Sequence, residues 1–240
     1  MNTKNKKYFE AGTFKIGCNY WPSRTGTNMW SDWQPKEIEK DLDVLLQHKI
    51  KLLRVFPLWS DFQPIETIRT YHGHTHEIKS CSDLTSPAEK NKACMNPVMM
   101  HRFASFADMA NKRGMHLIVG LLTGWMSSRL YAPPALNGMN LITNPIALLW
   151  ETRFVSAVVS EFKDHPAIIA WDLGNECNCM GSASREEAWL WLTLISSAIR
   201  LKDSEHPIIS GMHGTPVEPD LSLIHISEPT RLLSISYAVF

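Results

Sequence analysis

Short apolar segments alternate along the chain with longer segments whose apolar residues recur every three or four positions. The short segments are rich in β-branched residues and nearly continuous in apolar character, which is typical of strands covered on both faces. They predict five strands, at residues 13–20, 51–57, 116–122, 167–174 and 206–213. The periodic segments predict four helices, at residues 35–49, 96–114, 144–165 and 184–204.

Residues that favour helix ends stand at the expected boundaries. Asn96 and Asn144 precede two of the periodic segments and are good N-caps, and Gly114 fits a helix stop. Proline occupies the first turn of three predicted helices, at Pro35, Pro97 and Pro145. These signals support the helix boundaries independently of the apolar pattern.

Strictly alternating strands and helices predict βαβ units and a parallel sheet in an α/β protein. The segments that follow strands are long, especially residues 58–95, whereas those that enter strands are very short, a single residue in each of the ranges above. That asymmetry is typical of a (β/α)8 TIM barrel, whose functional groups lie on the loops after the strands. A doubly wound sheet is the alternative, but no glycine-rich phosphate loop follows the first strand, where "NYWPSRTGTNMW" stands.

Composition removes several classes of function. The chain has 24 basic and 24 acidic residues, so no charge excess indicates a nucleic acid or a membrane surface as a partner. No apolar run reaches membrane-spanning length, and the basic N-terminus lacks the apolar core of a signal peptide, which predicts a cytoplasmic protein. Five cysteines at irregular spacing imply no disulfide framework, although a bridge from Cys81 to Cys94 stays open.

Polar and aromatic side chains stand at or just after the carboxyl ends of the predicted strands. In a barrel these ends converge on one pocket, which predicts a site containing Asn19, Arg54, Trp59, Trp125, Asn175, Glu176 and His213. A carboxyl group walled by tryptophan can donate a proton near neutral pH, which suits Glu176. Asn175 can hydrogen-bond a substrate hydroxyl, and Arg54 can keep a neighbouring carboxylate ionised. Trp59 and Trp125 offer flat apolar faces to a sugar ring.

The "GNE" after the fourth strand, with "LRVF" on the second, resembles clan A glycoside hydrolases, especially family-5-like cellulases and mannanases. The resemblance covers roughly residues 14–214. It implies that Glu176 is the acid/base, that Asn175 binds the sugar 2-hydroxyl, and that Arg54 supports the nucleophile. It also implies an oligosaccharide or polysaccharide substrate and no metal or organic cofactor. This family usually places a His near the end of the third strand, where this chain has "LLTGW".

Structural explanations compete with each of these roles. Glu176 can cap the next helix, Arg54 can be an ion-pair partner, and each tryptophan can belong to the core. The histidines of "YHGHTHE" (71–77) lie in the long loop and favour a solvated segment over a metal site, and "CNC" (177–179) lacks the spacing of redox or zinc motifs. A carbohydrate-binding barrel without activity and a metal-dependent barrel hydrolase remain the alternative functions.

The chain length predicts an incomplete barrel. Strand starts recur about every 48 residues, so eight units would need on the order of 380 residues. Retaining glycosidases need two carboxyl groups, and the resemblance places the nucleophile on a seventh strand. "LSLIHISEPTR" (221–231) and "ISYAVF" (235–240) resemble the in-frame translation of a transposase-type sequencing adapter. We therefore expect residues 1–220 to be the N-terminal part of the catalytic domain and residues 221–240 to be a non-native tail.

Overall fold

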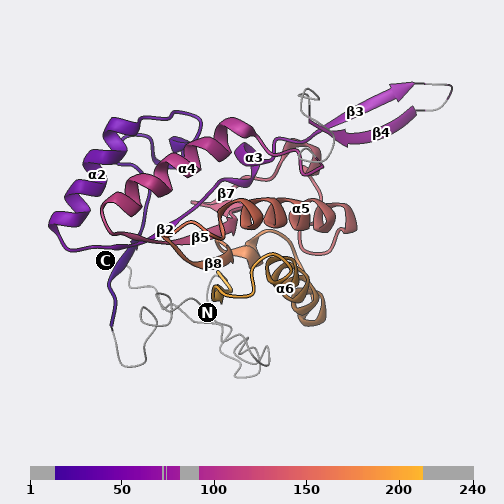
Figure 1. Ribbon diagram of the computed structural model, residues 1–240. Coiled ribbons are helices and arrows are strands. Elements are labelled where there is room, and N and C mark those ends of the chain that lie inside the picture. Colours follow the sequence, from indigo (N-terminus) through magenta and orange to yellow (C-terminus); the bar gives the residue numbers. More distant parts are fainter. Residues whose placement is uncertain (1–13, 72, 74, 82–91, 213–240) are drawn as a thin grey trace.

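The computed structural model describes residues 14–212, except residues 72, 74 and 82–91 (Figure 1). His213 and the segment 221–240 lie outside these ranges, so the expectations about them are not addressed by the fold.

The described residues form one parallel sheet of five strands. Its members are β1 (Gly17–Asn19), β2 (Leu52–Val55), β5 (His116–Leu122), β8 (Ile168–Gly174) and β9 (Ile208–Ile209), and they lie side by side in that order. Every strand pairs with the next parallel strand along the chain, as in a (β/α)8 barrel, whereas a doubly wound sheet reverses its order at a switch point. The barrel prediction is confirmed, and the described residues hold five consecutive strands of it.

Long helices connect the strands of this sheet. They are α2 (Pro35–Gln47), α4 (Pro97–Lys112), α5 (Pro145–Phe162) and α6 (Arg185–Arg200), each within a few residues of its predicted range. The Asn96 side chain accepts hydrogen bonds from the first-turn amides of α4, and Asn144 does the same for α5. Gly114 has a φ of 63°, the left-handed conformation expected just after a helix. The predicted caps are therefore confirmed.

The long segment after β2 contains structure that the sequence pattern did not predict. A short helix, α3 (Trp59–Phe62), precedes a two-stranded antiparallel hairpin of β3 (Glu66–Tyr71) and β4 (Thr75–Ser80). The hairpin extends away from the rest of the domain (Figure 1). The prediction of a solvated loop over 71–77 is wrong for Thr75 to Glu77, which belong to a paired strand.

The remaining described elements are short. A second hairpin joins β6 (Trp125–Met126) to β7 (Arg129–Leu130), and three 3-10 turns are η1 (Gly26–Met29), η2 (Pro134–Leu136) and η3 (Cys177–Cys179). β6 and η3 follow β5 and β8 respectively, so both lie at the carboxyl edge of the sheet. These are the turns that carry the candidate site.

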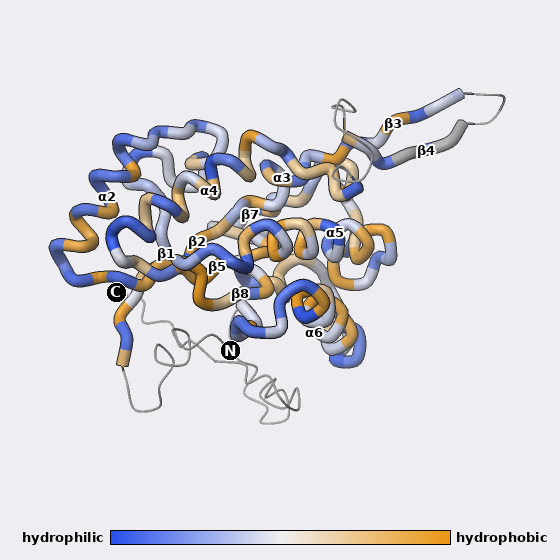
Figure 2. Tube along the Cα trace, in the orientation of Figure 1, coloured by the Kyte–Doolittle hydropathy of each residue, from blue (hydrophilic) through white to orange (hydrophobic). Residues whose placement is uncertain are grey.

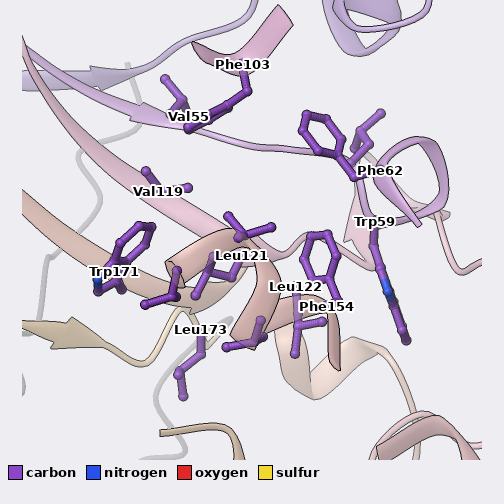
Figure 3. Packing of buried hydrophobic residues seen from close by; sticks show 14 of the residues in the cluster. Val55, Trp59, Phe62, Phe103, Val119, Leu121, Leu122, Phe154, Trp171 and Leu173 are labelled. Carbon is purple, nitrogen blue, oxygen red and sulfur yellow. The ribbon is translucent and has the colours of Figure 1, made fainter. Parts of the chain in front are cut away.

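The core lies between the sheet and the helices. Apolar residues concentrate along β5 and β8, whereas α2 alternates between polar and apolar positions (Figure 2). Val55, Val119 and Trp171 stand in register on three neighbouring strands and pack together on one face of the sheet (Figure 3). None of the helices in the described ranges is both long and apolar enough to span a membrane.

Candidate active site

The apolar strand β8 positions Asn175 and Glu176 by delivering them to the edge of the sheet. All seven residues of β8 are buried, and Glu176 follows directly after Asn175 at the strand's carboxyl end. Gly174 allows the end of β8 to lie close to the end of β5, because a Cβ at this position would lie 2.0 Å from the carbonyl oxygen of Leu122. The chain therefore uses a core strand to fix the position of one polar pair.

Glu176 has a strained backbone. Its φ of 51° and ψ of 44° place it in the left-handed region, which L-residues other than glycine, asparagine and aspartate rarely adopt. Strain of this kind costs on the order of 1 kcal/mol and is often found at functional sites. The side chain is half-buried, so it is shielded but reachable. A helix-capping role is not observed, since Glu176 makes no side-chain cap hydrogen bond to η3.

Arg54 joins β2 to β8 across the intervening strand β5. Its Nε lies 2.5 Å from Oδ2 of Asp172, and its Nη2 donates to the carbonyl oxygen of Gly174 at 2.8 Å. Its Nη1 donates to Oδ1 of Asn175 at 3.1 Å. Arg54 is therefore buried and fixed by contacts to β8 and to the residue that follows it. The sequence-based alternatives for Arg54, ion-pair partner and site residue, are both compatible with this geometry.

The Arg54 guanidinium lies over the outer ring of an aromatic stack. The Arg54 Cζ lies 4.6 Å from the ring centroid of Phe56, and Trp21 stacks on the same ring at 5.3 Å. Gly120 on β5 leaves room for this arrangement, because a Cβ there would lie 2.8 Å from the Phe56 ring. The low dielectric around these rings strengthens the electrostatic contacts of Arg54.

The amide of Asn175 is held at both ends. Its Oδ1 accepts from Arg54, and its Nδ2 donates to the carbonyl oxygen of Trp125 at 3.0 Å. Trp125 is held by the β6–β7 hairpin, whose turn residues Ser127 and Ser128 have φ values of 52° and 61°. The second N–H on Nδ2 points to the sulfur of Met126 at 3.9 Å, a weak acceptor that a substrate hydroxyl could replace.

Asp172 is a site residue that the sequence reasoning missed. It is 1 % exposed, and its Oδ1 accepts from the backbone amide of Gly174 at 3.1 Å. Burial raises the pKa of the Asp172 carboxyl, and the Arg54 guanidinium offsets part of that rise. The available signal was an aspartate inside an otherwise apolar strand, since a buried carboxyl group requires a partner.

The other predicted site residues have different outcomes. Asn19 is exposed on β1 and stands in register with Arg54, so both belong to the same face of the sheet. Trp125 is half-buried and its carbonyl oxygen accepts from Asn175, and its role as a platform for a sugar ring stays a prediction. The prediction that Trp59 faces the pocket is wrong. Its side chain is fully buried beside Phe154 (Figure 3), and its Nε1 donates to Oε1 of Gln63 at 2.7 Å. The helix α3 turns this ring into the core instead of toward a cleft.

The two other motifs, 71–77 and 177–179, are described only in part, since His72 and His74 are not included. Cys177 is buried and Cys179 is half-buried, and both are free thiols in η3. Within the described ranges, no three His, Cys, Asp or Glu residues gather closely enough to hold a metal ion. His72 and His74 lie outside those ranges.

Comparisons with known proteins address the fold and the relatives of this chain. No protein-family model matches the chain. A probable mannan endo-1,4-β-mannosidase F from Neosartorya fischeri is 24% identical over 205 residues, covering 81% of this chain and 42% of that protein. The mannan endo-1,4-β-mannosidase F of Aspergillus fumigatus is 29% identical over 205 residues, covering 81% and 44%. The chain thus spans about two fifths of the length of these curated relatives.

A solved structure of a mannosidase has a similar fold. The exo-β-1,4-mannosidase from Opitutaceae bacterium strain TAV5 superposes with a TM-score of 0.68 at 25% identity, covering 83% of this chain and 32% of that one. The chain has the family-5-like fold of clan A glycoside hydrolases, of the cellulase and mannanase type. The five strands described here are consecutive strands of such a barrel.

Proposed function

We propose that this chain is the N-terminal part of a retaining glycoside hydrolase that acts on β-mannosidic linkages by double displacement. The observation that carries the proposal is the end of β8, where a fixed Asn175 precedes a half-buried Glu176 in a strained conformation. The β-mannosidase names of the relatives and of the solved neighbour support the choice of sugar.

In this proposal, Glu176 first acts as a general acid. It protonates the departing glycosidic oxygen while a carboxylate nucleophile attacks the anomeric carbon and forms a glycosyl-enzyme. Glu176, now a carboxylate, then removes a proton from water, which attacks the anomeric carbon and releases the sugar with its original configuration. Nδ2 of the Asn175 amide binds the 2-hydroxyl in place of its weak contact with the Met126 sulfur, and Arg54 stabilises the ionised nucleophile.

Asp172 does not fit the role of the nucleophile. A nucleophile must reach the anomeric carbon, and in retaining enzymes its carboxyl group lies about 5–5.5 Å from that of the acid/base. Asp172 is nearly inaccessible, and its two oxygens are engaged by Arg54 and by the Gly174 amide. We therefore propose that the nucleophile comes from a later barrel strand, beyond residue 220. We also propose that residues 221–240 are non-native, because "LSLIHISEPTR" and "ISYAVF" resemble a translated sequencing adapter.

The test uses the complete protein and aryl β-mannosides. We expect Glu176→Gln to lower kcat by roughly 10²–10⁴-fold, because general acid assistance is lost. The matched control is Glu186→Gln, an exposed carboxylate in the first turn of α6, which should keep full activity. Full activity of the Glu176→Gln protein would overturn the proposal.

Two further measurements separate the alternatives. Quenching of tryptophan fluorescence by mannooligosaccharides without turnover would indicate a binding barrel, and loss of activity with a chelator would indicate a metal-dependent hydrolase. Expression of residues 1–220 and 1–240 tests the missing nucleophile. We expect no turnover from either, whereas turnover that Glu176→Gln abolishes would refute that part of the proposal.

A further inference from the structure

Two buried thiols, neither of them a residue of the candidate site, meet at the base of the β3–β4 hairpin. Cys81 follows β4 directly, and Cys94 lies just before α4. Both side chains are buried as free thiols, and they form a hydrogen bond with each other. The segment between them, residues 82–93, would become a closed loop if the two sulfur atoms were bonded.

Cys94 is held in place from both sides. The carbonyl oxygen of Ala93 accepts a hydrogen bond from Gln63 Nε2 at 2.8 Å, and the amide of Asn96 donates to the carbonyl oxygen of Phe62 at 2.8 Å. The φ of Cys94 is 50°, a left-handed conformation that persists in a non-glycine residue only where its surroundings impose it. The backbone position of Cys94 is therefore set by α3 and the residue that follows it.

Cys81 is held through the hairpin. The Nζ of Lys79 donates to the carbonyl oxygen of Ala135 at 2.8 Å and to Oγ1 of Thr67 at 3.1 Å, which fixes the end of β4. Because the residues next to both cysteines are fixed by hydrogen bonds, the contact between the two thiols is set by the fold. Preorganised thiols of this kind need little rearrangement to bond.

We propose that Cys81 and Cys94 are a disulfide-forming pair that joins the β3–β4 hairpin to the start of α4. The oxidant is a low-molecular-weight disulfide such as oxidised glutathione. The Cys81 thiolate attacks it and releases one glutathione thiol, and the Cys94 thiolate then attacks the mixed disulfide and releases the second. In total, the two protein thiols lose two protons and two electrons, and the oxidised glutathione takes up both.

The surroundings make this reaction slow. Burial and the neighbouring Cys81 thiol raise the pKa of Cys94 to about 12, and the positive charge of Arg153 offsets only a small part of that rise. Since the thiolate is the attacking species, the pair stays reduced until an oxidant has acted for a long time. The bridge is therefore a structural staple and not a rapid sensor, and it is independent of the proposed function.

Tryptic peptides report the bridge unambiguously. Cleavage after lysine and arginine places Cys81 in residues 80–90 and Cys94 in residues 93–102, each as the single cysteine of its peptide. The full chain is incubated with oxidised glutathione, blocked with N-ethylmaleimide under denaturing conditions and digested. We expect a covalent pair of these two peptides, dissociated by reduction, and a Tm increase of roughly 5–10 °C that reduction reverses.

Two variants serve as controls. Cys94→Ser should lose both the linked peptides and the gain in Tm, whereas Cys18→Ser removes another cysteine and should keep both. The wild-type peptide map decides the question even if Cys94→Ser fails to fold. Maleimide-labelled Cys81 and Cys94 after oxidation, a stable glutathione adduct on either residue, or a bridge between other cysteines would overturn the proposal.

Discussion

The Nε of Arg54 lies 2.5 Å from Oδ2 of Asp172, so a buried ion pair joins β2 to β8 across the strand between them. Both side chains are almost inaccessible, and the carboxylate also accepts the amide hydrogen of Gly174. Through the same guanidinium the pair fixes the Asn175 amide, next to Glu176. The geometry of the candidate acid/base is thus tied to a polar contact inside the core.

We expect Arg54 and Asp172 to be strongly coupled in stability. Arg54→Met or Asp172→Leu alone should lower the free energy of unfolding by about 3–5 kcal/mol, because each leaves a buried charged group without its partner. The double variant should lose much less than the sum of the two. Urea unfolding of the four proteins measures this coupling, and additive losses would show that the two groups are independent.

Glu151 should make stability depend on pH. This side chain is fully buried between α5 and α6, accepts from Trp191 Nε1 at 2.8 Å, and has a pKa that burial raises to about 8. A raised pKa means that the folded state favours the protonated carboxyl. The corresponding stability is complete below about pH 4.5 and is lost as the pH rises to about 8.

The free energy of unfolding should fall by on the order of a few kcal/mol over this pH range, and Glu151→Gln should abolish this fall. Glu161→Gln is the matched control, because Glu161 is exposed on the same helix and should leave the pH profile of stability unchanged. Unfolding free energies between pH 4 and 9 decide this. A wild-type profile that is as flat as that of Glu151→Gln would contradict the assignment.

The left-handed backbone of Glu176 predicts an unusual order of stabilities. Glycine adopts this conformation without strain, whereas alanine does not. Glu176→Gly should therefore be more stable than Glu176→Ala by about 1 kcal/mol, the reverse of the order in a helix or strand. Thermal unfolding of the two variants measures the difference, and a more stable alanine variant would show that the site is not strained.

Replacing Trp59 and replacing Trp125 should affect different properties, stability in the first case and glycan binding in the second. Trp59→Ala removes a fully buried ring and should lower the free energy of unfolding by about 3–5 kcal/mol. Trp125 is half-buried, so Trp125→Ala should cost less stability and weaken glycan binding by the complete protein. A smaller stability loss for Trp59→Ala than for Trp125→Ala would reverse this interpretation.

The periodic pattern was sufficient to locate the sheet and the long helices. Residues 116–122 and 167–174 were predicted as strands and are observed as His116–Leu122 and Ile168–Gly174. The hairpin of β3 and β4 was missed, because β3 is mostly exposed and the two strands contain few apolar residues. Its pairing depends on cross-strand contacts such as Arg69 with Glu77, which a search for buried patterns does not detect.

The site was only partly predictable, for a physical reason. Glu176, Asn175 and Arg54 were found because parallel strands bring their carboxyl ends together. Asp172 was missed, since its importance comes from a partner 118 residues away in the chain. The direction in which Trp59 points depends on the turn of α3, which the sequence around it did not reveal. Position along a strand is readable from sequence, but side-chain partners at long range are not.

The most direct test of the central claim is the anomeric configuration of the first-formed product. The complete protein is mixed with an aryl β-mannoside in the NMR tube, and the anomeric proton signals are followed before mutarotation. We expect the β-anomer to appear first, because double displacement through Glu176 and a second carboxylate retains configuration. Initial release of the α-anomer would contradict the retaining mechanism proposed for this site.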